Sequence, residues 1–416
     1  MSKALYWFRN NLRLHDNPSL NQALEENDEI FPVFMVPPDD STHRKVGFSD
    51  FGNHRKKFLW EAVEDLSARI EQLGGKLSIL QGDPVELITS CCELLGVQTV
   101  YASKEVGFNE VQEEVELTAS IELILREDQF LINPEEAPFD LDKVPFGFSS
   151  FRKKVEKYWQ PREKVLLAKG HFSATELSTF RMPEIKVNFD PRSAHPFLGG
   201  ETSGLSRLKG YLWDSRKVEA YKFTRNQLIG QDFSSKFSAF LALGCLSPIQ
   251  LYQEVGRYEE EVKQNVSTYW LKFEMLWREF FRYTSLRYGA HFYQIGGIQQ
   301  KEISWLKSQK RLQQWINGET GDDFVNANMI ELAETGFMSN RGRQNAASYL
   351  VHDMGVDWRW GADYFEKVLV DYDCASNWGN WMYVAGVGND RRNHKFDTHW
   401  QAEKYDANGA YRDLWL

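Results

Sequence analysis

The chain has 416 residues, of which 42% are hydrophobic and 26% are charged, and it carries a formal net charge of −10. This length predicts about two domains, and the composition argues against a membrane-spanning protein because no apolar run approaches the roughly 20 residues of a membrane helix. The acidic charge argues against non-specific coating of DNA, and the N-terminal segment lacks a signal-peptide pattern, so we expect a cytoplasmic protein.

Residues 1–130 alternate short apolar runs with amphipathic runs. We predict strands at 4–8, 30–35, 77–80, 97–102 and 121–125, and helices that begin at Pro18, cover 54–73, begin again at Pro84 and cover 111–118. Strand and helix alternate at the spacing of a doubly wound parallel sheet, so this part is predicted to be a Rossmann-like α/β domain. No GxGxxG motif follows the first strand and no Walker loop is present, so the domain lacks a dinucleotide-binding fingerprint.

Residues 131–200 show weak periodicity and contain seven prolines, which predicts a long connector with one basic helix near residues 151–159. From residue 201 to near residue 373 the patterns are mainly helical, and we assign residues 201–416 to a second, all-α domain. None of the four cysteines lies in a CxxC pair, which argues against a zinc site and fits a reducing compartment. His394 and His399 do not share a helix face, so we predict no metal site.

A cluster of three serines, Ser234, Ser235 and Ser238, precedes a predicted helix that ends near Gly244. Backbone N–H groups and serine oxygens at the start of a helix suit a pyrophosphate. The alternative is that a serine merely caps the helix.

Glu274 and Trp277 share one face of the predicted helix at residues 269–281. A carboxylic acid beside a large aromatic ring could serve as a proton donor, because an apolar wall raises its pKa. The alternative is an ordinary helix ion pair between Glu274 and Arg278, one turn apart.

A further helix face and the segment after it combine amides, an arginine and two carboxylates. The face is formed by Asn340, Arg343, Gln344 and Ala347. Arg343 has the chemistry for a fixed ion pair with Asp371 or Asp373, and Asn377 adds an amide that both donates and accepts. Such a set can bind a large polar heterocycle.

Taken together, these segments resemble the DASH branch of the photolyase and cryptochrome family. The resemblance extends over nearly the whole chain, from the segment at residues 6–17 to the last residues, and is dense at 204–208, at 240–248 and from residue 270 onward. It implies an α/β antenna domain, a linker and an all-α domain that binds FAD. The implied FAD contacts are Tyr221, Ser234, Ser235, Lys236, Phe237, Ser238, Trp270, Glu274, Arg278, Asn340, Arg343, Asp371, Asp373 and Asn377.

The resemblance also assigns individual roles. Electrons would reach the flavin along Trp305, Trp358 and Trp381, with Trp381 next to the flavin and Trp305 at the surface. Asn377 would face the flavin N5 atom, and Arg343–Asp371 would be the salt bridge behind the ring. Residues that would contact DNA or a pyrimidine dimer are Arg225, Trp277, Arg341, Gln344 and Tyr383, with Arg391 and Arg392 as further phosphate contacts.

Gln344 and Tyr383 are typical of the DASH branch, where relatives outside it carry Met and Trp. Asn109 and Glu110 resemble the pair that binds a folate-type antenna, such as methenyltetrahydrofolate, and the alternative is an ordinary helix N-terminus. The sequence stops at Leu416 without a long tail, which weakens the expectation of a purely sensory role.

The resemblance therefore implies light-driven repair of cyclobutane pyrimidine dimers by electron transfer from excited FADH⁻, preferentially in single-stranded DNA. Glu274 would hydrogen-bond to the dimer or protonate it, Asn377 would favour the reduced flavin, and Trp277 would stack on the dimer. The alternative is a blue-light photoreceptor that signals through nucleic acid or a protein partner. A redox enzyme using NAD(P)H lacks any nicotinamide fingerprint. We expect a monomer whose main partner is single-stranded DNA.

Overall fold

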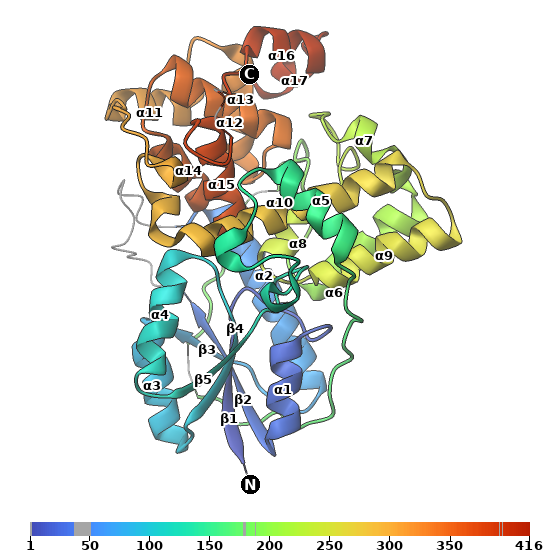
Figure 1. The fold of residues 1–416 in the computed structure, drawn as a ribbon, viewed down its shortest axis with the longest axis vertical. Helices are drawn as coiled ribbons and strands as arrows, with labels where there is room; N and C mark the ends of the chain where they lie inside the picture. The colour runs from blue at the N-terminus through green and yellow to red at the C-terminus, as the bar shows by residue number, and fades with distance from the viewer. Residues whose placement is uncertain (1, 37–50, 178–179, 188, 391, 393) are drawn as a thin grey trace.

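The computed structural model describes residues 2–36, 51–177, 180–187, 189–390, 392 and 394–416. In the N-terminal part of these residues, five parallel strands form one sheet in the order β3-β2-β1-β4-β5 (Figure 1). The strands are β1 Lys3–Phe8, β2 Glu29–Val36, β3 Ser78–Gln81, β4 Thr99–Ser103 and β5 Glu122–Arg126. The helices between them are α1 Pro18–Glu26, α2 Asn53–Gln72, α3 Pro84–Leu95 and α4 Phe108–Thr118. This confirms the predicted doubly wound α/β domain.

The central strand explains why the sheet is covered on both faces. From Ala4 to Phe8 every residue of β1 is buried. Tyr6 and Phe8 belong to one core cluster, whereas Leu5 and Trp7 belong to another. Successive side chains point to opposite faces of a strand, so a continuous apolar run is what a parallel sheet between two helix layers requires.

The first and third helices begin as predicted. Asn17 accepts a hydrogen bond from the backbone N–H of Leu20, and Pro18 occupies the first helical position. Asp83 caps α3 in the same way before Pro84. Proline is favoured at this position because it lacks the N–H that would have no intrahelical partner.

The connector carries the predicted basic helix, α5 Phe148–Tyr158, which buries Phe148, Phe151 and Val155. After α5 the described residues of the connector run along the α/β part and form no helix or strand before α6 (Figure 1). Arg162 pairs there with buried Asp16 at 2.6 Å, and Phe172 forms a bridge with Ile30 of β2. These contacts fix a proline-rich segment to the surface of the sheet domain.

The rest of the described chain is helical up to Trp415, beyond the predicted limit near residue 373. The helices are α6 Glu201–Lys209, α7 Tyr221–Thr224, α8 Ser238–Ala242, α9 Pro248–Glu261, α10 Val266–Tyr288, α11 Gln309–Ile316, α12 Asp323–Thr335, α13 Asn340–Ser348, α14 Trp358–Val368, α15 Cys374–Val384, α16 Thr398–Tyr405 and α17 Ala410–Trp415. The long helix α10 packs against α5, α7, α9 and α15. This confirms the predicted all-α part, while the domain limits 1–130, 131–200 and 201–416 stay a prediction. In the described residues, no helix combines the length and the apolar character that a bilayer span requires.

The last helix, α17, is held by two distant parts of the chain. The hydroxyl of buried Tyr411 donates its hydrogen bond to Glu331 of α12 and lies 3.1 Å from Asn328 Oδ1. The guanidinium of Arg192, in the connector, lies 4.1 Å from the ring centre of Trp415. Burial raises the pKa of Glu331 to about 7. A buried carboxyl group without a hydrogen-bond partner would destabilise the fold, and the Tyr411 hydroxyl supplies that partner.

Candidate functional site

The ion pair between α13 and the start of α15 is the structural centre of the site. Helix α13 begins at Asn340 because Ser339 accepts a hydrogen bond from the Gly342 N–H, and this orients Arg343. Arg343 Nη2 lies 2.9 Å from both carboxylate oxygens of Asp371. Burial would raise the pKa of Asp371, but Arg343 and the Ser238 hydroxyl outweigh it and lower that pKa. The predicted Arg343–Asp371 pair is therefore formed.

Asp373 has a different partner. It caps α15 by accepting a hydrogen bond from the Ser376 N–H at 2.7 Å, and it faces Arg282 Nη1 at 3.5 Å. Burial favours protonation of Asp373, but the charges of Arg278 and Arg282 outweigh it and lower the pKa. Of the two carboxylates predicted for Arg343, the structure selects Asp371, and Arg282 is a site residue that the sequence analysis missed.

The serine-rich loop before α8 is held by an arginine that was not predicted either. Arg207 donates to the carbonyl oxygens of Ser234 and Ser235 at 3.1 and 3.0 Å, and to Asp232 at 2.7 Å. Phe237 occupies the cap position of α8 without a side-chain hydrogen bond. The alternative of a simple serine cap is therefore wrong.

Lys236 lies in this loop with its backbone in the left-handed region, at φ +61°. Its side chain is almost fully buried, and its Nζ atom lies 3.3 Å from the Phe233 ring centre. Burial lowers the pKa of Lys236 well below its usual value.

Several buried polar atoms around the site have no hydrogen-bond partner within the protein. They are Lys236 Nζ, Arg278 Nε, Arg282 Nε, Arg282 Nη2 and Gln344 Oε1. A buried donor without an acceptor costs about 1–3 kcal/mol, and more if it is charged. Four of these five atoms are donors on basic side chains, which matches a ligand that presents phosphate and carbonyl oxygens. The residues present therefore fit the flavin nucleotide that the resemblance implies.

Glu274 lies on α10 and is held from one side. Its Oε1 accepts hydrogen bonds from Arg225 Nη1 at 2.7 Å and from Trp270 Nε1 at 3.1 Å. Arg278 donates instead to the Gln129 carbonyl oxygen at 2.8 Å. The alternative Glu274–Arg278 pair is therefore wrong. Burial raises the pKa of Glu274 in spite of Arg225 and Trp270. Buried Tyr221, at the start of α7, lies close enough for the Glu274 charge to raise the pKa of its hydroxyl further.

Aromatic rings line the rim next to Glu274. Trp277 stacks on Phe148 of the connector helix with ring centres 3.7 Å apart and an interplanar angle of 10°. Tyr383 meets Trp277 edge-on at 6.2 Å and stacks on His394 at 4.0 Å. His394 also lies 3.3 Å from Asp390. Phe148 was not predicted, because nothing in its local pattern indicates that it covers one face of Trp277.

The predicted amides occupy three different environments. Asn377 is buried on α15 and donates to the Ala362 carbonyl oxygen of α14 at 3.0 Å. Gln344 lies partly buried on α13, whereas Asn340 is exposed at the first position of that helix. Their contacts with a flavin stay a prediction.

The predicted tryptophan path lies in the core cluster formed by α11 to α15. Trp358 and Trp381 are buried, and Trp305 packs against the same cluster. The neighbouring residue Leu306 donates a backbone hydrogen bond to Gly355 and accepts one from Asp357, just before α14. These bonds bring Trp305 near the start of that helix. The ring partners of Trp381 include Phe365 at 5.1 Å and Trp315 at 6.1 Å. Electron hopping along the three predicted residues therefore stays a prediction.

The predicted antenna pair lies in the first turn of α4. Asn109 is exposed, and Glu110 is partly buried. Burial raises the pKa of Glu110 to about 7. Burial raises the pKa values of Tyr293 and Cys374 in the helical part, and the nearby charge of Glu110 raises them further. Glu110 therefore lies where the two parts of the chain meet. A folate-type antenna at this position stays a prediction.

The predicted DNA-contacting arginines differ in their partners. Arg225 pairs with Glu274, whereas Arg341 bonds to Asn226 and Gln401. Arg392 is exposed and pairs with Asp390 at 2.7 Å. Arg391 lies outside the described residues.

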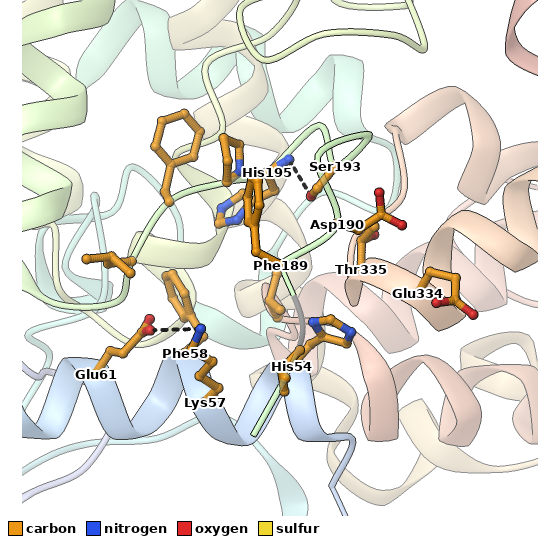
Figure 2. A pocket seen from close by; sticks show the side chains of 15 residues that line it. His54, Lys57, Phe58, Glu61, Phe189, Asp190, Ser193, His195, Glu334 and Thr335 are labelled. Carbon is orange, nitrogen blue, oxygen red and sulfur yellow. Dashed lines mark hydrogen bonds and ion pairs between the residues drawn. The ribbon is translucent and has the colours of Figure 1, made fainter. Parts of the chain in front are cut away.

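A separate cavity of about 90 Å³ opens behind the site, between α2, the connector and the end of α12 (Figure 2). About half of its lining side chains are polar, namely those of His54, Lys57, Glu61, Asp190, Ser193, His195, Glu334 and Thr335. His195 stacks on Phe337, whose ring centre lies 4.5 Å from Lys236 Nζ. Burial lowers the pKa of His195 to about 4, so its ring is neutral at physiological pH. The cavity touches the back of the site but includes none of the predicted flavin contacts among its described lining residues.

Comparisons with known proteins agree with this geometry. Residues 4–167 match the family described as DNA photolyase, and residues 270–416 match the FAD binding domain of DNA photolyase. The chain is 42% identical to cryptochrome DASH of Synechocystis sp., over 99% of this chain and 87% of the relative, and 42% identical to cryptochrome DASH of Xenopus laevis, over 98% and 81%. The crystal structure of the Synechocystis sp. cryptochrome superimposes with a TM-score of 0.95 at 42% identity, over 100% of this chain and 88% of that one. The archaeal photolyase of Sulfolobus tokodaii, solved with two FAD molecules, gives a TM-score of 0.80 at 26% identity, over 100% and 90%. The chain therefore belongs to the photolyase and cryptochrome family, in its cryptochrome DASH branch, and carries the FAD-binding domain of that family.

Proposed function

We propose that this chain is a deoxyribodipyrimidine photolyase that splits cyclobutane pyrimidine dimers with light, preferentially in single-stranded DNA. Membership of a DNA photolyase family supports contact with DNA. The observation that carries the proposal is the arrangement of Glu274, which is fixed by Arg225 and Trp270 and lies on the same helix face as Trp277. When bound and reduced, FAD would supply the electron that opens the dimer ring under light and would take it back afterwards.

The residues of the chain have three tasks in this proposal. Arg343 and Asp371 hold the flavin side of the site in one geometry. Glu274 presents a carboxyl group of raised pKa, which can share a proton with a carbonyl oxygen of the dimer. Phe148 covers one face of Trp277 and so fixes the ring that would stack on the dimer.

Glu274→Ala should lower the repair rate by about 10- to 150-fold, because a hydrogen bond to a charged group contributes about 1.5–3 kcal/mol. The wild-type rate should fall as the pH rises through the raised pKa of Glu274, since the proton donor is lost there. Glu274→Gln can donate a hydrogen bond but does not titrate, so its rate should not show this fall. Repair yields measured across pH for the three proteins provide the check, and a pH fall that persists in Glu274→Gln would assign the proton to another group.

The substrate preference is tested by illuminating the fully reduced protein with dimer-containing single strands and duplexes of equal sequence. Flipping a base out of a duplex costs a few kcal/mol, and each 1.4 kcal/mol is tenfold, so we expect repair of the duplex to be about 10- to 1000-fold weaker. Gln344 and Tyr383 at the pocket support this preference as branch markers. Equal repair of both substrates would contradict it, and no repair of either would favour the photoreceptor.

A further inference from the structure

Two large aromatic side chains lie exposed near the candidate site. Phe223 on α7 is 72% exposed, and Trp400 on α16 is 50% exposed. Single exposed apolar residues need no explanation, but a set of them rimmed by charges marks an interaction surface. The question is therefore whether these two rings belong to one surface.

Arg341 joins the two helices. Its Nη2 donates to Asn226, just after α7, at 3.1 Å, and its Nη1 faces Gln401 of α16 at 3.4 Å. Its guanidinium also lies 4.7 Å from the ring centre of Tyr405, at the end of α16. Contacts through one side chain thus connect the loop after α7 with α16.

Positive charges follow the aromatic rings along this connection. Lys404 Nζ lies 4.4 Å from the Trp400 ring centre and 5.4 Å from that of Tyr405. At the other end, Arg225 pairs with Glu274 at 2.7 Å. We name this surface the aromatic–basic strip, formed by Phe223, Arg225, Arg341, Trp400, Lys404 and Tyr405. The strip begins at the candidate site and leads away from it.

We infer that the aromatic–basic strip binds the unpaired nucleotides that adjoin the lesion, with Phe223 and Trp400 stacking on bases and the basic side chains contacting phosphates. Interleaved aromatic and basic side chains are how proteins bind single strands without reading sequence. A duplex offers no free base faces, so the strip would favour single-stranded DNA independently of the cost of base flipping. This inference rests on the proposed function, whose substrate it specifies.

Measuring DNA binding in the dark tests the strip separately from repair, because repair requires light. Fluorescence anisotropy would measure the affinity of the flavin-loaded protein for a labelled thymidine decamer, without and with a central dimer. Phe223→Ala and Trp400→Ala should each weaken binding by about 5- to 150-fold, the range for loss of one stacked base. Trp400→Phe, which can still stack, should restore most of the affinity. Phe189→Ala is the matched control, since Phe189 is 65% exposed on the connector and lies outside the strip.

A second arm uses the isolated thymine dimer dinucleotide, which has no flanking nucleotides to reach the strip. The variant that combines Phe223→Ala and Trp400→Ala should repair this dinucleotide as fast as the wild type while binding the decamer more weakly. Decamer binding unchanged in this variant would overturn the inference, and so would an equal loss in Phe189→Ala. Strip-dependent binding by a protein that repairs no substrate would support the strip and contradict the proposed function.

Discussion

Replacing Arg343 with alanine is expected to abolish stable flavin binding and to lower the free energy of unfolding by about 3–5 kcal/mol. The reason is that Asp371 is 6% exposed and would remain as a buried carboxylate without its cation. Denaturant unfolding and the ratio of flavin to protein absorbance after reconstitution measure the two effects. Full flavin content in Arg343→Ala would contradict the assignment of this pair to the cofactor site.

Two further variants show that the loss comes from an unpaired charge. Combining Arg343→Ala with Asp371→Asn should recover part of the stability, because the amide buries no charge. Lys143→Ala breaks an exposed pair with Asp140 and should leave the free energy of unfolding nearly unchanged. The pKa of Asp371 is lowered, so the pair stabilises the folded state at neutral pH and loses that contribution only as the pH falls through the lowered pKa.

Replacing Trp381 with phenylalanine is expected to reduce photoreduction of oxidised flavin to background, while chemically reduced protein still repairs dimers. Trp381 is buried at the predicted flavin end of the electron path, where it would pass the electron to the flavin, and phenylalanine is far harder to oxidise than tryptophan. Loss of oxidised flavin absorbance under blue light, with an external electron donor present, provides the measurement. Photoreduction of Trp381→Phe at the wild-type rate would show that the electron does not reach the flavin through Trp381.

The control for this variant comes from the structure. Trp315 lies 6.1 Å from Trp381 between ring centres but is not part of the predicted path. Trp315→Phe should therefore photoreduce normally, whereas Trp358→Phe should be slow. The opposite ranking would route the electron through Trp315.

What the sequence predicted well was set by local chemistry. Pro18 and Pro84 mark helix starts because only the first turn tolerates a missing N–H, and the apolar run of β1 indicates a strand covered on both faces. Opposite charge alone limited the partner of Arg343 to Asp371 or Asp373, and the resemblance chose Asp371.

What it could not predict depends on packing between distant segments. Glu274 has Arg278 one turn away, yet it pairs with Arg225, the residue directly after α7, because α7 packs against α10. Arg207 of α6 binds the serine-rich loop before α8, and Phe148 of α5 stacks on Trp277. The hydrophobic periodicity of α5 and α6 does not indicate either partner. The left-handed backbone conformation of Lys236 could not be predicted from the sequence either, since lysine is not favoured in that region of φ and ψ.

The docking of α17 bears on how the protein is made. During synthesis α12 leaves the ribosome well before residues 410–415. Until α17 follows, Glu331 lacks the Tyr411 hydroxyl that donates a hydrogen bond to it in the folded protein. Arg192 is synthesised earlier still, and it likewise lacks its contact with the Trp415 ring until α17 has been made. The nascent helical part thus exposes apolar and acidic surface until α17 has been made, and exposed apolar surface of this kind makes a folding intermediate prone to aggregate.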